Sequence, residues 1–418
     1  MKFHRTVFPN GLTVLTEPMP HVRSLSMGVW LKSGSRNETE KLNGITHFIE
    51  HMLFKGTMSR SAAQIASEMD SLGGNLQAFT GKETVSFQCK VLDSHFEKAF
   101  NILSDLVLNP RFDPHDIQRE KKVIYEEIKM DEDNPDLLVH ELFTQNYFPK
   151  HPLGRSILGT RNSLRKITEN HVRHEYTRNF SANNLVITAA GRLDNKRFLD
   201  MVRNKFGPIP RGEKMVHRKA PRANPTWIVR RKKSLEQVQI CIGMPAPAAA
   251  NEDRFATHVL NVILGGSMSS RLFQKVREEQ GLAYSIYSDL SSYHDTGVML
   301  VFAGTSKASA RKVIQAVIKE AESLRATPPT KQELRLAKDH LKGNMMLGLE
   351  SSTSRMSLLA RQEMYFKEFP TLDQILRKIE SVTAENILAV SKQMFRPGHM
   401  AVTLLGDIRE FNQNEILH

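Results

Sequence analysis

Apolar residues recur with two different spacings along the chain, and breaks containing glycine or proline separate the two kinds of segment. Strict alternation predicts half-buried strands, whereas apolar positions three and four apart predict helices with one buried face. In the first half, strands are expected at 3–8, 12–16, 24–31, 76–79, 84–91 and 184–191. Helices are expected at 44–54, 62–72, 94–108, 116–130, 137–147, 168–176 and 194–206.

The second half repeats this order of elements. Strands are expected at 238–244, 283–290, 297–303 and 400–406, and helices at 254–264, 272–279, 308–324, 331–349 and 383–394. Gly28 and Gly243 stand in corresponding strands, and Pro114 and Pro329 precede corresponding long helices. A repeat of this length indicates duplication of one large unit rather than a solenoid. We therefore predict an α+β fold with two homologous domains, each a mostly antiparallel sheet covered by helices.

The length of 418 residues agrees with two domains, since a single core rarely grows beyond about 250–300 residues. The expected domains are residues 1–209 and 235–418, joined by a basic, proline-containing linker at 210–234. With 40% hydrophobic and 25% charged residues, the composition is that of a globular protein and excludes a collagen-like, coiled-coil or disordered chain.

The formal net charge of +13 raises the question of an anionic partner. No aromatic pattern accompanies the basic linker and no nucleic-acid-binding motif occurs, so we expect no nucleic-acid partner. No apolar run approaches the roughly 18 residues of a membrane span, so we expect no membrane association. Two distant cysteines, Cys89 and Cys241, and the lack of a signal-peptide pattern favour a reducing, cytoplasmic location. A mature organellar chain that has lost its presequence would have the same appearance.

The chemistry of the chain is concentrated in the first helix of the first half, which contains His47, Glu50 and His51. Histidines four apart project from one helix face and can converge on a metal, and Glu50 lies close to the same face. This is the HxxEH order, the inverse of HExxH. Two polar surface histidines on an amphipathic helix are the simpler interpretation. The strongly apolar remainder of the helix favours a metal, because ionisable groups on a buried helix need a partner.

A catalytic zinc usually has three protein ligands and one open position. The helix at 116–130 offers Glu120, Glu126 and Glu127. Glu120 and Glu127 are seven apart and share a face, while Glu126 points away from it. Spacing alone leaves open whether these carboxylates bind a metal or form a solvated helix face.

The run at 43–57, NGITHFIEHMLFKGT, resembles the inverted-motif zinc peptidases, a family that includes pitrilysin, insulin-degrading enzyme and the mitochondrial processing peptidase. The chain is most similar to the half-size bacterial members of that family. The resemblance implies that Glu127 is the third zinc ligand, that Glu120 supports the ligands from behind, and that Glu50 is the general base.

The resemblance extends to the second half. Arg277 and Tyr284 match a family pair that reaches the substrate. Without that resemblance, they would be interpreted as a surface arginine on a helix and a tyrosine on a strand. Both can donate hydrogen bonds to a peptide carbonyl or its oxyanion. Thr257, Leu260 and Asn261 stand where the first half has its two histidines and glutamate, so one zinc per chain is expected.

The resemblance also implies a substrate strand at Gln77, Ala78 and Phe79, where relatives often have asparagine in place of Gln77. The function it implies is a zinc metalloendopeptidase that binds peptides or unfolded segments as an added strand in the chamber of a homodimer. The alternative is a non-catalytic scaffold or partner subunit of a processing-peptidase-like complex. The sequence leaves open the natural substrate, and whether the enzyme processes precursors or clears peptides.

Overall fold

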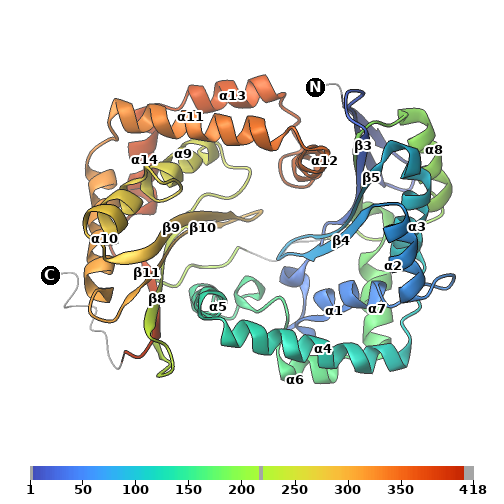
Figure 1. The fold of residues 1–418 in the computed structure, drawn as a ribbon, viewed down its shortest axis with the longest axis horizontal. Helices are drawn as coiled ribbons and strands as arrows, with labels where there is room; N and C mark the ends of the chain where they lie inside the picture. Colours follow the sequence, from blue (N-terminus) through green and yellow to red (C-terminus); the bar gives the residue numbers. More distant parts are fainter. Residues whose placement is uncertain (1–2, 216–219, 409–418) are drawn as a thin grey trace. The chain divides into compact units, whose positions relative to one another are not determined.

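The computed structural model describes residues 3–215 and 220–408, and the chain divides into two compact units (Figure 1). The first unit comprises residues 1–129, 155–219 and 348–369, and the second comprises 130–154, 220–347 and 370–418. Across the described residues, no helix is both long and apolar enough to cross a membrane.

The first unit contains a six-stranded sheet in the order β1-β2-β6-β3-β5-β4. All neighbouring strands are antiparallel except β2 and β6, which are parallel. The strands are β1 (His4–Val7), β2 (Thr13–Pro18), β3 (Ser24–Leu31), β4 (Asn75–Thr80), β5 (Val85–Leu92) and β6 (Leu185–Gly191).

Helices cover both faces of this sheet because its central strands are apolar on both sides. Val29 and Ile187 belong to the main core, whereas Trp30 and Val186, each one position away, belong to a separate cluster with Met356. Figure 1 shows α12 on one face of the sheet and α2, α3 and α8 on the other. The helices of this unit are α1 (Ile45–Leu53), α2 (Ala62–Ser71), α3 (Phe96–Leu108), α4 (Pro114–Asp133), α6 (Arg161–Lys166), α7 (Glu169–Asn179), α8 (Asn195–Phe206) and α12 (Ser352–Arg361).

The second unit contains a five-stranded sheet in the order β7-β11-β8-β10-β9. Only β7 and β11 are parallel, so this order reproduces β2-β6-β3-β5-β4 of the first sheet. The predicted α+β fold with two homologous, mostly antiparallel sheets is therefore confirmed. The strands are β7 (Trp227–Arg231), β8 (Gln237–Ala246), β9 (Ala283–Ser292), β10 (Gly297–Ser306) and β11 (Ala401–Gly406).

The second sheet is also covered on both faces. Cys241 and Phe302 pack with Phe143 of α5, while Ile242 and Val301 face the main core of the unit. The helices of this unit are α5 (Pro135–Tyr147), α9 (Arg254–Leu264), the π-helix η6 (Phe273–Glu279), α10 (Ala310–Ala326), α11 (Lys331–Gly348), α13 (Leu372–Glu380) and α14 (Ala384–Met394).

The compact units differ from the continuous domains 1–209 and 235–418 because each contains a helix from the other half. Helix α5 packs on β8 and β11, and α12 packs on β3 and β6. The linker at 210–234 is also partly ordered as sheet, since β7 pairs with β11 in the register Trp227 to Val402. Residues 216–219 of that linker lie outside the described residues. Helices α6, α12 and α13 were not among the predicted elements.

The two glycines that mark the repeat lie beneath these exchanged helices. A Cβ on Gly28 would stand 3.2 Å from Met356 Sδ of α12, and a Cβ on Gly243 would stand 2.0 Å from the ring of Phe143 of α5. Glycine at these strand positions therefore lets a helix approach the sheet closely.

We expect Gly243→Ala to destabilise the second unit by about 1–3 kcal/mol, because the added methyl group overlaps a buried ring. The change should appear in urea unfolding followed by Trp227 fluorescence in a Trp30→Phe background. Gly343→Ala is the matched control, since no atom lies within 4 Å of its Cβ position and helix α11 should gain about 0.5–1 kcal/mol. Equal stability of the two variants would contradict the packing described here.

Candidate metal centre

Helix α1 is amphipathic. Its apolar side chains are buried in the main core of the first unit, and Phe48, Ile49 and Met52 are almost fully enclosed. His47, Glu50 and His51 project from the remaining surface of the helix, and each is partly buried. Burial of one side thus fixes the direction in which the three ionisable side chains point.

The structure brings His47 and His51 together with Glu127 of α4. One ligand atom from each of these residues lies within 4.8 Å of the others, and His51 Nε2 is 3.6 Å from Glu127 Oε1. Glu126, the neighbouring carboxylate, is exposed and forms an ion pair with Lys129. Among the described residues, no second group of three histidines, cysteines or carboxylates converges in this way.

Glu120 supports His51 from behind. Its carboxylate is 2.8 Å from His51 Nδ1 and 2.8 Å from Lys55 Nζ, and the side chain is almost fully buried. Donation from Nδ1–H to the carboxylate leaves Nε2, the nitrogen nearer Glu127, with its lone pair available. A carboxylate behind a histidine is the usual support of a metal ligand.

Burial and neighbouring charges shift the pKa values of the two histidines in opposite directions. Burial lowers the pKa of His47 to about 3, and the charge of His51 acts in the same direction, so His47 is neutral at physiological pH. Burial also opposes a charge on His51, but the hydrogen bond with Glu120 and the nearby carboxylates outweigh it and raise its pKa. A metal therefore competes with a proton at His51 and not at His47.

The donor set fits zinc. Two imidazole nitrogens and one carboxylate oxygen form a three-ligand set typical of catalytic zinc. His47 Nδ1 is buried and has no hydrogen-bond partner among the described residues, so the site contains a polar group that needs a ligand. His47, His51 and Glu127 are the residues that would hold the ion.

Glu50 lies beside this group and is held by a different partner. The hydroxyl of Thr80, at the end of β4, donates a hydrogen bond to Glu50 Oε2. Burial raises the pKa of Glu50, and the charge of Glu127 adds to that effect, while the Thr80 bond and His51 oppose it. A carboxyl group with a raised pKa beside a metal group is suited to proton transfer.

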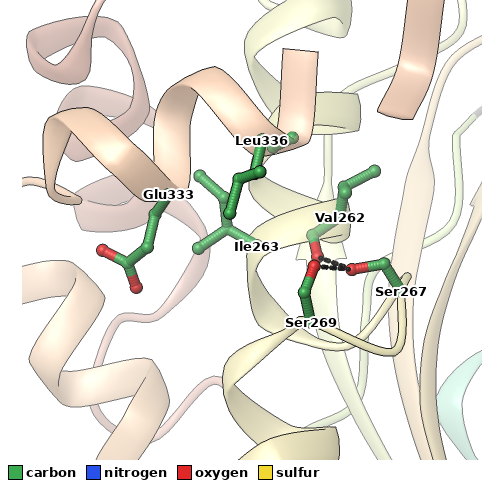
Figure 2. A pocket seen from close by; sticks show the side chains of 7 residues that line it. Val262, Ile263, Ser267, Ser269, Glu333 and Leu336 are labelled. Atoms are coloured by element: carbon green, nitrogen blue, oxygen red, sulfur yellow. Dashed lines mark hydrogen bonds between the residues drawn. The ribbon is translucent and has the colours of Figure 1, made fainter. Parts of the chain in front are cut away.

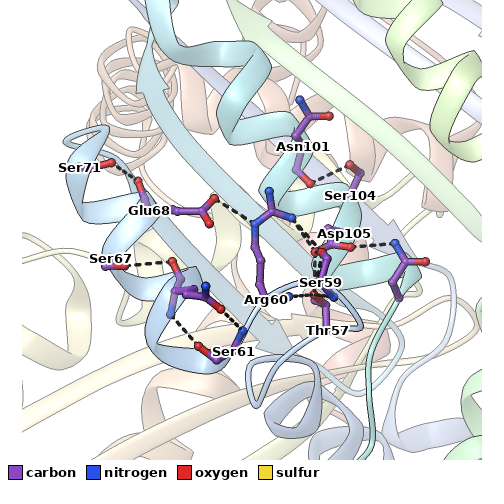
Figure 3. Close-up of polar contacts among 12 residues, drawn as sticks. Thr57, Ser59, Arg60, Ser61, Ser67, Glu68, Ser71, Asn101, Ser104 and Asp105 are labelled. Carbon is purple, nitrogen blue, oxygen red and sulfur yellow. Dashed lines mark hydrogen bonds and ion pairs between the residues drawn. The ribbon is translucent and has the colours of Figure 1, made fainter.

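The loop after α1 is tied to helix α3 through Asp105 (Figure 3). The hydroxyls of Thr57 and Ser59 and the Nη1 of Arg60 each donate to Asp105 Oδ2 at 2.7 Å. These bonds lower the pKa of Asp105 despite the opposing effect of its burial. The carboxylate therefore holds the chain just beyond the metal helix.

Gln77, Ala78 and Phe79 lie on β4, the last strand of the first sheet. Their side chains alternate, with Gln77 and Phe79 exposed and Ala78 packed against the core. Within the described parts of the chain, β4 pairs with β5 alone. Its outer edge is available to another extended segment.

Arg277 and Tyr284 lie together in the second unit. The Arg277 guanidinium stands over two rings, with Cζ 4.7 Å from the centroid of Phe273 and 5.0 Å from that of Tyr284. Tyr284 is 80% exposed. The pair is a preformed cationic and hydroxyl surface on η6 and β9.

Two further features of the second unit form no group of convergent metal ligands among the described residues. Thr257 and Leu260 of α9 are fully buried packing residues. A cavity of about 30 Å³ lies between α9 and α11 (Figure 2), and the hydroxyl of Ser267 already bonds Ser269 and the carbonyl of Val262. The cavity has room for one or two water molecules.

Comparisons with known proteins show which family the chain resembles. The family model described as insulinase, peptidase family M16, matches residues 13–161, and the model described as the peptidase M16 inactive domain matches residues 166–341. An uncharacterized zinc protease of Bacillus subtilis is 39% identical over 389 residues, which cover 92% of this chain and 94% of the relative. An uncharacterized zinc protease of Mycobacterium leprae is 37% identical over 404 residues, covering 96% and 91%.

Two solved structures share the fold at 19% sequence identity. A protease from Helicobacter pylori has a TM-score of 0.91 and covers 97% of this chain and 99% of its own. A peptidase M16 inactive domain from Pseudomonas fluorescens has a TM-score of 0.92 and covers 99% and 100%. Fold, motif and relatives define a zinc protease-like chain. The chain belongs to the insulinase family of peptidases, M16, which confirms the predicted resemblance.

Several residues of the site were not predicted. Thr80 bonds Glu50 of α1, Lys55 pairs with Glu120 of α4, and Asp105 holds the loop after α1 at Thr57. Lys55 lies four positions after His51, just beyond the end of α1, and this spacing is a detectable signal for a shared partner. Thr80 and Asp105 belong to no local pattern.

We expect zinc affinity to rise with pH and to level off once His51 has lost its proton. Because the pKa of His51 is raised, zinc must displace a proton there at any lower pH, and the rise extends above the ordinary histidine pKa. Chelator competition across pH values should show this. Glu120→Gln removes the anionic partner and lowers the pKa of His51. The affinity should then level off at a lower pH, with a plateau weaker by about 10- to 100-fold. Glu126→Gln, on the same helix, should match the wild type. A pH-independent wild-type affinity would contradict this account.

Proposed function

We propose that the chain is a zinc metalloendopeptidase that hydrolyses peptides or unfolded segments. The observation that carries this proposal is the convergence of His47, His51 and Glu127, with Glu50 placed beside them by a separate partner. The relatives named zinc proteases support the metal and the class of reaction. The intact ligand set weighs against the scaffold alternative.

Zinc held by these three residues would supply Lewis-acid chemistry, lowering the pKa of a water to about 7 and polarising a carbonyl. Glu50 takes the proton of the attacking water and then delivers it to the leaving amine. Thr80 engages Oε2 of Glu50, which leaves Oε1 for the water. The raised pKa of Glu50 strengthens it as the proton carrier.

The outer edge of β4 would bind the substrate as an added strand. Backbone groups of Gln77, Ala78 and Phe79 would pair with the peptide, and the exposed Phe79 side chain would contact its residues. Such pairing depends little on sequence and suits unfolded segments. Arg277 and Tyr284 would bind the peptide carbonyl and its developing charge. Both cysteines are free and buried, which fits the proposed cytoplasmic location.

Glu50→Gln should abolish cleavage of a quenched peptide library while zinc binding persists, because the amide cannot accept the proton from water. Turnover and metal content are measured on the same preparation. Glu126→Gln should keep wild-type turnover. An active Glu50→Gln enzyme would overturn the assigned base. A wild-type chain that binds no zinc and cleaves nothing would favour the scaffold.

We also propose that the enzyme is a homodimer in which Arg277 and Tyr284 of one chain complete the zinc site of the other. Co-expression of a Glu50→Gln chain with an Arg277→Ala chain should then restore cleavage that neither variant has alone, because one intact site forms in the mixed dimer. Mass measurement in solution gives the oligomeric state. A fully active monomer, or no restoration in a proven mixed dimer, would contradict the shared site.

A further inference from the structure

One short buried segment contacts both the start of α1 and the turn that follows β4. Residues 34–38 lie in the connection from β3 to α1 and contain the 3-10 turn η1 (Ser35–Asn37). Glu50 belongs to α1, and its partner Thr80 ends β4, just before the turn at 81–84. The 34–38 segment bonds to the start of α1 through one side chain and to the turn through another.

The first of these side chains is Glu38, which is 4% exposed and caps α1. Its Oε1 accepts from the Thr46 amide at 2.8 Å, and its Oε2 accepts from the Gly44 amide at 2.8 Å and from Asn43 Nδ2 at 2.9 Å. The cap residue Gly44 has no side chain to serve this purpose. A Cβ there would stand 2.6 Å from the Leu158 carbonyl oxygen, and the backbone φ is +92°. A carboxylate six residues before the cap therefore satisfies amides that a helix start leaves unpaired.

The second side chain is Arg36, which is fully buried. Its Nη1 donates to Glu83 Oε1 at 2.5 Å, and its backbone amide donates to the Lys82 carbonyl at 2.7 Å. A Cβ on Gly34 would stand 2.4 Å from the Gly81 carbonyl oxygen, so the segment lies directly against the turn. The turn that follows Thr80 is thus held by the same segment that caps the metal helix.

We propose that Arg36 and Glu38 are positioning residues that set the spacing between α1 and the end of β4, and so hold Glu50 against Thr80. This inference rests on the proposed function of Glu50. A buried charge pair and a buried cap resist displacement, because breaking either leaves a charge unpaired in the interior. The two side chains are two positions apart on one short turn. A shift at the start of α1 therefore moves the turn after β4. If Glu50 is displaced, the enzyme should lose turnover rate more than affinity for its substrate.

The kinetic test uses the full-length enzyme and a quenched peptide, with rates expressed per zinc-loaded chain. Glu38→Gln keeps the size of the side chain but puts an NH2 group where a carboxylate oxygen faces a donor. We expect it to lower kcat by about 10- to 100-fold and to leave KM within about twofold of the wild type. The matched control is Glu40→Gln, an exposed carboxylate in the next turn, which should match the wild type.

A double-mutant cycle separates positioning from general stability. Thr80→Val removes the hydroxyl through which the segment acts on Glu50. If the proposal holds, Glu38→Gln should cost little further activity in the Thr80→Val background. Arg36→Lys gives a second cycle if Glu38→Gln does not fold, and the same lack of additivity is expected. Independent, multiplicative losses in kcat, or a change in KM alone, would overturn the proposal.

Hydrogen exchange tests the coupling without relying on activity. In Glu38→Gln, peptides covering 44–54 and 78–86 should both exchange faster than in the wild type, and in Glu40→Gln neither should change. Faster exchange confined to 44–54 would show that the segment does not couple the two elements. A wild-type chain that cleaves nothing would defeat the proposed function, and the exchange result would still decide the coupling.

Discussion

The structure of the first unit depends on one constraint on a nine-residue helix. Helix α1 must bury an apolar side in the core and, on its other side, hold three ionisable groups in a partly buried setting. Burying such groups is costly unless each has a partner. Glu120 serves His51, Thr80 serves Glu50, and Glu127 converges with both histidines. Helix α4 and strand β4 must therefore meet α1 at these residues.

The second unit retains the sheet order and the close helix packing over a strand glycine, but not the ionisable groups. At the corresponding positions of α9, Thr257 and Leu260 are buried packing residues. The duplicated sheet thus persists without the metal group, because it is stabilised by apolar packing and strand pairing on both faces. The sheet fold of this chain therefore does not depend on the ionisable groups that the first unit carries.

Local patterns predicted much of this. Periodicity predicted every strand except β7 and most of the helices, and the four-residue spacing predicted that His47 and His51 share a helix face. Choosing Glu127 over Glu126 required the family resemblance, since both occur in one charged helix. The structure shows the physical reason, because Glu126 turns to solvent and Lys129.

Other features could not be read from a single sequence, because they depend on side-chain and strand contacts that no local periodicity encodes. The close approach of α12 and α5 to the sheets needs the room above Gly28 and Gly243, which the sequence shows only as matching strand glycines of the repeat. Glu38 looks like a surface glutamate until the amides of Gly44 and Thr46 are found around it. Strand β7 lies in a basic, proline-containing stretch and forms because β11 supplies a parallel partner.

The most direct test is anomalous X-ray diffraction at the zinc absorption edge from crystals of the purified chain. The account predicts one zinc peak per chain, about 2.0–2.2 Å from a nitrogen of His47, a nitrogen of His51 and an oxygen of Glu127. It also predicts that Glu50 and Glu120 do not coordinate the ion. A peak bound by other residues, or no peak at this group in a zinc-loaded crystal, would contradict it.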